Sequence, residues 1–238
     1  MNESLPQDLG EMIAHGKANM PNERPLLVCK PHKVESWRVF KIMSEFVEGF
    51  ETLQRYGLAA SFFGTARASF EDTVYQHASE LAARLAKQGF AVITGGASGV
   101  MQAANKGAFD AGGASVGLNI DLENGQSYNN FLTDKLQFEH FFVRKTMLTY
   151  ASEVYIYFPG GFGTLDEFFE IITLIQTEKI RKVPVVLFGK TFWTPLIEFL
   201  EKTLYEKHKA IDKKDLELFV LVDSVDEAYD YIVKNVQC

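Results

Sequence analysis

The stretch Pro159–Thr164 contains three glycines, and it follows a short apolar run, Val154–Phe158. That run is rich in aromatic and β-branched residues, which favours a buried strand. An amphipathic helix is predicted to begin at about Thr164. Glycine permits positive φ angles and lets a ligand approach the main chain closely. Because a strand, a glycine loop and a helix start leave free N–H groups at one point, this stretch predicts a phosphate-binding site. The glycines alone would also fit a purely structural turn.

Charged residues near this loop are candidates for chemistry. Glu167 lies one turn into the predicted helix, where the dipole favours an ionised carboxylate. Such a group suits a base, or an anion facing a developing cation, rather than a general acid. Thr164 is expected to cap the helix, and Asp166 to face solvent. Upstream, Arg144 precedes Lys145. Arg144 can supply a forked cation to a sugar hydroxyl, phosphate or carboxylate, but a solvated helix start explains the pair equally well.

Two further predicted strands also run into glycine-bearing loops, at Gly64–Arg67 and Gly95–Gly99. In a parallel sheet all three loops fall on the same edge, which is where nucleotides bind in this class of fold. Gly64 and Gly96 are therefore added to the candidate phosphate site. None of the loops spells G-x-G-x-x-G, so a dinucleotide cofactor is not indicated.

Strand and helix patterns alternate along most of the chain. Strands are predicted at 58–63, 90–94, 115–120, 136–142, 154–158, 183–188 and 218–222. Helices are predicted at 35–56, 71–88, 99–111, 143–152, from about 164, at 193–208 and at 225–236. The alternation predicts a doubly wound α/β fold, with a mainly parallel sheet and helices on both faces. Residues 1–34 carry four prolines and are interpreted as an irregular arm, and residues 35–238 as a single domain.

The overall composition narrows the classes of partner. The chain has 238 residues and a net charge of −7, which argues against broad adhesion to nucleic acid or to an anionic membrane. Its two cysteines, Cys29 and Cys238, form no disulfide framework and fit a reducing, cytoplasmic location. No apolar stretch reaches transmembrane length, and the N-terminus does not read as a signal peptide. The five histidines show no metal-ligand spacing, so no metal is expected.

The nonapeptide from Pro159 to Glu167 fits the PGGxGTxxE signature of the LONELY GUY (LOG) family, long labelled lysine decarboxylase-like. Arg144-Lys145 stands at the position of the family's RK pair. The segments SFFGTARAS, VITGGASGVMQAANKGA and VGLNIDLE also resemble the family, so the likeness covers about residues 58–190. The longer N-terminal part resembles that of bacterial members rather than the short plant-type ones.

The resemblance implies a Rossmann-like fold, usually as a homodimer or higher homo-oligomer, that works without a cofactor. It implies hydrolysis of the N-glycosidic bond of a nucleoside 5′-monophosphate, such as AMP or a cytokinin riboside monophosphate, to free base and ribose 5-phosphate. Arg144 and Glu167 would be the catalytic pair. The residues Gly160, Gly161, Gly163 and Thr164 would hold the phosphate. Lys145 and Thr173 would contact the substrate.

The chemistry inferred from the residues agrees, because cleaving a ribosyl C–N bond builds positive charge on the sugar that the Glu167 carboxylate can oppose. Glu139, His140 or a water are candidates for the acid that protonates the base, and Val100-Met101 and residues 121–135 are candidates for contacts to it. The alternative is a nucleotide-binding sensor with little or no turnover. A lysine decarboxylase would need pyridoxal phosphate and a Schiff-base lysine, and nothing in the sequence supplies that arrangement.

Overall fold

The computed structural model describes residues 35–69, 72–121 and 127–237, and within them seven parallel strands form one sheet in the order β4-β3-β2-β1-β5-β6-β7. The strands are β1 Ala59–Phe63, β2 Ala91–Thr94, β3 Ser115–Ile120, β4 Asp134–Phe138, β5 Val154–Tyr157, β6 Val185–Phe188 and β7 Val220–Val222. The predicted α/β, Rossmann-like fold class is confirmed. The predicted arm at 1–34 lies outside the described residues.

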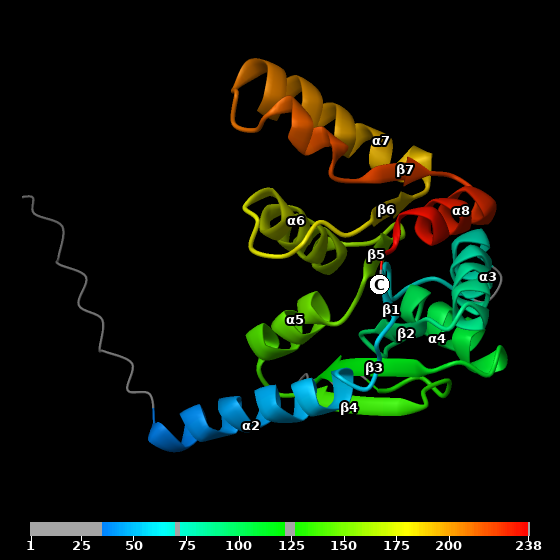
Figure 1. Cartoon of the computed structure of the whole chain (residues 1–238), viewed down its shortest axis with the longest axis vertical. Helices are drawn as coiled ribbons and strands as arrows, with labels where there is room; N and C mark the ends of the chain where they lie inside the picture. The colour runs from blue at the N-terminus through cyan, green and yellow to red at the C-terminus, as the bar shows by residue number, and fades with distance from the viewer. Residues whose placement is uncertain (1–34, 70–71, 122–126, 238) are drawn as a thin grey trace, which may run out of the picture. The chain divides into compact units, whose positions relative to one another are not determined.

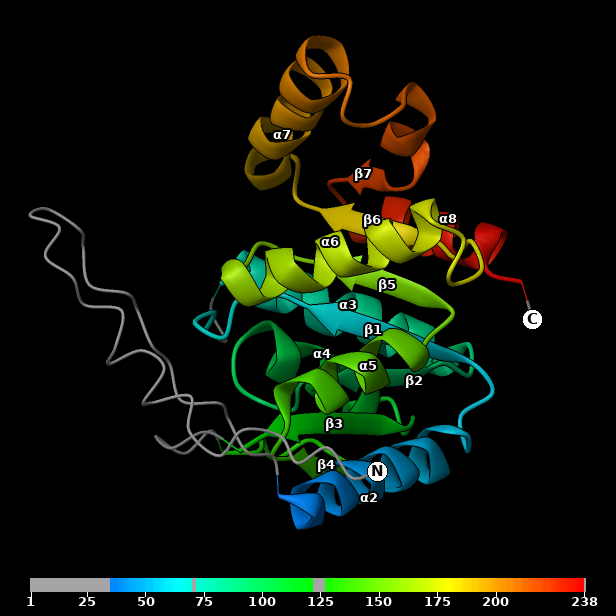
Figure 2. The ribbon, with the colours of Figure 1, turned by 90° about the vertical axis from the view of Figure 1, so that its left-hand side faces the viewer.

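Helices cover both faces of the sheet (Figure 1). They are α2 Ser36–Leu53, α3 Thr73–Lys87, α4 Val100–Asp110, α5 Phe141–Tyr150, α6 Phe162–Gln176, α7 Lys190–Phe199 and α8 Val225–Asn235, with a π-helical extension of α7 at Leu200–Lys207 and a 3-10 helix at Lys213–Glu217. Helices α3, α4 and α8 lie on one face, and Figure 2 looks onto the other face, where α5 and α6 cross the strands.

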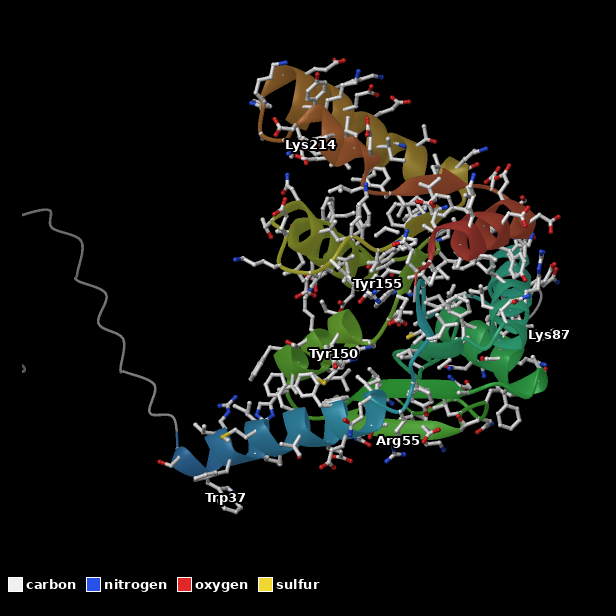
Figure 3. The ribbon with its side chains drawn as sticks, viewed as in Figure 1. Trp37, Arg55, Lys87, Tyr150, Tyr155 and Lys214 are labelled. Carbon is white, nitrogen blue, oxygen red and sulfur yellow. The ribbon has the colours of Figure 1, made fainter. Side chains whose placement is uncertain are left out.

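Strand β5 shows how one sequence serves the cores on both faces. Tyr155 and Tyr157 belong to the core beneath α5 and α6, whereas Val154 and Ile156 belong to the core beneath α3, α4 and α8 (Figure 3). All four residues are buried. Side chains alternate between the two faces of a strand, so a strand covered on both faces reads as a continuous apolar run.

Two predicted boundaries near the glycine loop are wrong. The segment 136–142 was expected to be a strand, but β4 ends at Phe138 and helix α5 already begins at Phe141. The apolar run continues from strand into helix, and periodicity alone does not separate the two in so short a run. Helix α6 begins at Phe162, with Gly161 as its extended N-cap residue, and not at about Thr164. Thr164 therefore lies inside the first turn and is not the cap.

The order of the strands places the glycine loops together. β1 pairs with β2 on one side and with β5 on the other, so the three strands that precede the loops are neighbours. The chain winds outward from β1 to β4 and returns to β5, which makes β1 and β5 the point where the winding reverses. Backbone hydrogen bonds tie the loops, from Thr65 N–H to the Pro159 carbonyl (2.9 Å) and from Val100 N–H to the Thr65 carbonyl (2.9 Å). The loops meet on one edge, as predicted, and ligands bind at such a point in open α/β sheets.

Helix α2 is confirmed as a helix, but many of its apolar side chains are exposed. Val39, Met43 and Val47 are exposed, whereas Glu45 and Gly49 are buried. Other large apolar side chains of the helix are exposed as well, and Trp37 points away from the ribbon (Figure 3). None of the helices in the described part of the chain is long and apolar enough to cross a membrane.

Candidate functional site

A cavity of about 700 Å³ opens at the reversal point of the sheet. The loops after β1, β2 and β5 line it, together with side chains from α4, α5, α6 and α7. The predicted site residues that line it are Gly64, Arg144, Gly160, Gly161, Gly163, Thr164 and Glu167. The structure therefore brings seven of the ten predicted residues to one cavity.

The start of helix α6 forms one wall of this cavity. The first backbone bond of the helix runs from Leu165 N–H to the Gly161 carbonyl (3.1 Å), so the N–H groups of Phe162, Gly163 and Thr164 precede the helical ladder. Such N–H groups and the helix dipole favour an anion. Gly160 has no room for a side chain, because a Cβ atom there would overlap the side chain of Thr164.

Glu167 is the buried carboxylate of the cavity. Its residue is 6% exposed, and burial raises its pKa to about 7, although Lys145 and Arg144 oppose part of that rise. The helix dipole was expected to keep Glu167 ionised, but with a pKa of about 7 the group is only partly ionised at neutral pH. Because α6 begins at Phe162, Glu167 lies in the second turn, where the effect of the dipole has largely faded. A carboxyl group of this kind exchanges a proton easily near pH 7.

Arg144 lies in the first turn of α5, is half-buried and lines the cavity, so it is not a fully solvated residue at a helix start. Its Nε donates a hydrogen bond to the Leu118 carbonyl (2.9 Å), and its guanidinium lies 5.9 Å from the ring centroid of Phe141. Burial lowers the pKa of Arg144, and the negative charge of Glu167 acts in the opposite direction. Arg144 still has free donors for a ligand, because it forms no ion pair within 4.0 Å with any described carboxylate.

Two predicted substrate contacts, Lys145 and Thr173, lie outside this cavity. They line a neighbouring hollow of about 360 Å³. Lys145 forms ion pairs there with Asp166 and with Glu170, the latter at 3.3 Å. Asp166 is exposed to solvent, as expected, and it also lines both spaces. The Thr173 hydroxyl donates to the Phe169 carbonyl (2.7 Å).

Gly96 shapes its loop without lining the cavity, and its neighbour Gly95 takes the lining position. Gly96 is buried and has a φ of +71°, a conformation that glycine adopts without strain. Its N–H donates to the Thr94 hydroxyl (2.8 Å), and its carbonyl accepts from Asn129 N–H (2.9 Å). The predicted glycine is thus structural support for the rim.

Several side chains of the cavity were missed as site residues. They are Arg67, Met101, Phe141, Phe162 and Phe192. Arg67 ends a loop that the sequence already placed on the ligand-binding edge of the sheet, so the sequence could have identified it as a site residue. Val100 and Met101 were candidates for contacts to the base; Met101 lines the cavity, whereas Val100 is buried. Phe162 is 93% exposed, which its central place in the glycine signature did not reveal.

Comparison with known proteins places the chain in a family. Residues 101–232 match the family model described as "Possible lysine decarboxylase". The chain belongs to this family, and the resemblance to the LONELY GUY proteins is confirmed. It is 27% identical over 134 residues to the cytokinin riboside 5′-monophosphate phosphoribohydrolase of Rhodococcoides fascians, covering 55% of this chain and 68% of the relative. It is also 27% identical over 170 residues to the enzyme of that name, LOG, of Oryza sativa subsp. japonica, covering 69% and 68% of the two chains.

Solved structures show the same fold. The molybdenum cofactor carrier protein of Chlamydomonas reinhardtii is 22% identical, with a TM-score of 0.58 and coverage of 74% of this chain and 96% of that one. The molybdenum cofactor binding protein of Rippkaea orientalis is 19% identical, with a TM-score of 0.55 and coverage of 74% and 94%. At these identities the likeness establishes the architecture alone.

Metal chemistry has no ready set of ligands in the described residues, where no group of three His, Cys, Asp or Glu side chains is arranged to hold an ion. The charged groups of the large cavity are Arg67, Arg144, Asp166 and Glu167. They can neutralise a phosphate, fix hydroxyl groups and exchange a proton.

Proposed function

We propose that this protein hydrolyses the N-glycosidic bond of a nucleoside 5′-monophosphate and releases free base and ribose 5-phosphate. The observation that supports this most directly is the pairing of two features in one cavity. The N-terminal end of α6 offers N–H groups to an anion, and the buried Glu167, with a pKa near 7, opens onto the same space. The names of the relatives, cytokinin riboside 5′-monophosphate phosphoribohydrolases, fit that pairing.

The 5′-phosphate would bind at the start of α6. The N–H groups of residues 162–164 precede the helical ladder and can donate to phosphate oxygens. Arg67 lines the same cavity and forms no ion pair with any described residue, so its guanidinium is available to the phosphate. Energy from this binding would position C1′ of the ribose near Glu167, since contacts with remote parts of a substrate lower the barrier at the reacting centre.

The reaction step would use Glu167 in its ionised form. As the C1′–N bond breaks, positive charge grows on the ribose, and the carboxylate stabilises that charge. The attacking water adds to C1′ and gives its proton to Glu167, while the electron pair of the broken bond leaves with the base. Arg144 would hold the ribose in the orientation for attack.

The leaving base must gain a proton. The two candidate acids Glu139 and His140 do not line the cavity. Glu139 pairs with Lys41, and His140 with Glu45, which occupies both side chains elsewhere. The proton therefore comes from solvent or from Glu167 after it has accepted the proton of the water.

We retain the homodimer as part of the proposal. Exposed apolar side chains on α2 and α5, among them Met43, Val47 and Phe142, form the surface that a second copy would cover. Light scattering after gel filtration measures the mass directly. A mass of one chain at micromolar concentration would remove the dimer from the proposal and leave the hydrolase assignment intact.

The experiment that tests the function is the release of ribose 5-phosphate from a panel of nucleoside 5′-monophosphates. Wild type is compared with Glu167→Gln and with Glu201→Gln, which removes an exposed carboxylate outside the cavity. We expect cleavage of at least one monophosphate, a loss of at least about 100-fold in Glu167→Gln, and no change in Glu201→Gln. If no monophosphate is cleaved but AMP raises the melting temperature, the protein is a nucleotide sensor. If none is cleaved and none binds, the assignment of the cavity is wrong.

A further inference from the structure

Glu45 is a buried carboxylate on a helix that does not reach the cavity. It lies in the middle of α2 and is 8% exposed. Both of its oxygens accept hydrogen bonds from the segment before α5. Glu139 N–H donates to Oε1 (3.2 Å), and His140 N–H donates to Oε2 (3.3 Å). Nδ1 of His140 lies 3.0 Å from Oε1, and because a carboxylate only accepts, that bond places a proton on Nδ1.

These contacts surround the residue that begins helix α5. His140 is the N-cap residue of α5, with an extended backbone, and Glu45 reaches it from a different helix. A carboxylate at this position accepts hydrogen bonds from backbone N–H groups, and its negative charge interacts favourably with the positive end of the helix dipole. The cap residue fixes the direction in which a helix leaves it, so Glu45 holds the starting point of α5.

Arg144 follows one turn later. Its backbone N–H donates to the carbonyl of His140 (3.2 Å), in the first turn that the Glu45 contacts hold. The side chain of Arg144 then reaches the carbonyl of Leu118 and lies against Gly95. A small change in the direction of α5 would move the guanidinium away from both.

Other contacts keep α2 alongside α5. A Cβ atom on Gly49 would overlap the side chain of Met147, so glycine permits close approach of the two helices. Phe50 meets Tyr150 edge to face, with ring centroids 4.9 Å apart. Removing Glu45 therefore takes away the polar contact at one end of this pair and leaves its apolar contacts in place.

We propose that Glu45 is a positioning residue for the reaction: it fixes the N-terminal end of α5 and thereby the place of Arg144 in the cavity. This inference rests on the proposed function, in which Arg144 orients the ribose. It makes α2, which precedes the sheet and does not line the cavity, part of the machinery that sets the rate.

The test compares Glu45→Gln and Glu45→Ala with Glu48→Gln, which makes the same charge change at an exposed position of α2. We expect Glu45→Gln to lower kcat by roughly tenfold or more with little change in KM, since misplacing a catalytic group affects the reaction more than binding. Glu45→Ala should lose more, and Glu48→Gln nothing. In an Arg144→Ala background, Glu45→Gln should have no further effect on the residual kcat, because both changes act through the same group.

Two results would overturn the proposal. One is an unchanged kcat in Glu45→Gln. The other is an equal loss in the wild-type and Arg144→Ala backgrounds, which would indicate a general structural role. If wild type cleaves no nucleotide, the proposed function fails, and the positioning role of Glu45 is then tested by the crystal structure of Glu45→Gln. If the Arg144 guanidinium still bonds to the Leu118 carbonyl in that structure, Glu45 does not position Arg144. Glu45→Gln keeps one acceptor oxygen, so it remains informative if Glu45→Ala does not fold.

Discussion

The guanidinium of Arg144 occupies the space that a side chain on Gly95 would fill. Gly95 has no positive φ angle, so its backbone would accept any residue, and the requirement for glycine is one of space. The atoms that a Cβ would meet are Nη2 of Arg144 and Sδ of Met101. Both are at the ends of flexible side chains that line the cavity. Glycine at position 95 is therefore needed to leave room for the Arg144 guanidinium, and not to stabilise the loop.

Gly95→Ala is therefore predicted to impair activity while leaving stability nearly intact. The added methyl group displaces the guanidinium of Arg144, and a catalytic group that is moved by about 1 Å can lose roughly 100-fold in rate. Steady-state kinetics should show a fall in kcat of at least about tenfold, with a melting temperature within a few degrees of wild type. Gly57→Ala is the control, because a Cβ there has no atom within 4 Å. Equal kinetics of the two variants would contradict the role assigned to Gly95.

The pKa of Glu167 predicts the pH dependence of the reaction. Because burial raises this pKa to about 7 and the ionised form is the active one, kcat/KM should rise with pH through about 7 and then level off. The phosphate of the substrate has its own second pKa near about 6. A binding titration of the same nucleotide to Glu167→Gln isolates that contribution. A rate that falls as pH rises through 7 would instead make Glu167 a general acid.

The same group predicts a pH dependence of stability. The folded pKa of about 7 lies above the ordinary value of 4.5, so the folded state binds the proton more tightly than the unfolded state. The stabilisation from this proton is complete below pH 4.5 and is lost as pH rises through 7. Urea unfolding at pH 4.5, 6 and 8 should show wild type losing on the order of 3 kcal/mol relative to Glu167→Gln. Parallel stability curves for the two proteins would show that Glu167 has an ordinary pKa.

The fold was predictable because the apolar runs, the helix periodicity and the glycines all indicated the same alternation of strands and helices. Apolar runs such as Val185–Phe188, buried on both faces, alternate with amphipathic helices that end near glycines, and that alternation specifies a parallel α/β sheet. The glycines that follow three of the strands correctly predicted the edge of the sheet where the cavity lies. The start of α6 was predicted two residues late, because Phe162 and Gly163 read as loop residues although they take helical geometry.

The electrostatics of the site were less predictable than its location. The pKa of Glu167 depends on burial by side chains from distant parts of the chain, which the helix pattern does not contain. The separation of Lys145 from Arg144 arises because consecutive helical residues point in different directions. The role of Glu45 was hidden for a related reason. A carboxylate within an apolar helix reads as an exposed residue until its partner, the start of α5, is known.

Arg67→Ala tests which side chain neutralises the phosphate. Arg67 forms no ion pair with a described residue, so its loss should weaken substrate binding and not disturb the catalytic groups. We expect KM for a nucleoside 5′-monophosphate to rise about tenfold or more, since a charged hydrogen bond contributes about 1.5–3 kcal/mol. We also expect a smaller fall in kcat, because the phosphate contact helps to position C1′. Arg38→Ala, at an exposed position of α2, controls for the change in net charge. An unchanged KM would leave the N–H groups of α6 as the phosphate site without Arg67.

Gly99→Ala and Gly112→Ala compare a crowded, strained glycine position with an open one. Both glycines have positive φ angles, +70° for Gly99 and +75° for Gly112, so both substitutions strain the backbone. Gly99 has a ψ of −133°, outside the left-handed helical region, so its substitution carries the larger strain. A Cβ on Gly99 would also overlap the carbonyl of Thr65 and the backbone of Ala66, whereas a Cβ on Gly112 has no atom within 4 Å. Backbone cannot move aside as a flexible side chain can. Urea unfolding should therefore show a loss of about 1 kcal/mol in Gly112→Ala and of more than about 2 kcal/mol in Gly99→Ala.

The two variants should also differ in activity. Thr65 connects the loops, because it bonds to both Pro159 and Val100, and the overlap at Gly99 would push it toward the cavity. Below its unfolding temperature, Gly99→Ala should bind nucleotide more weakly than wild type, and Gly112→Ala should bind it equally well. Calorimetric titration with AMP measures both. If the variants lose the same stability and bind alike, the contact of Gly99 with Thr65 does not hold the rim of the cavity together.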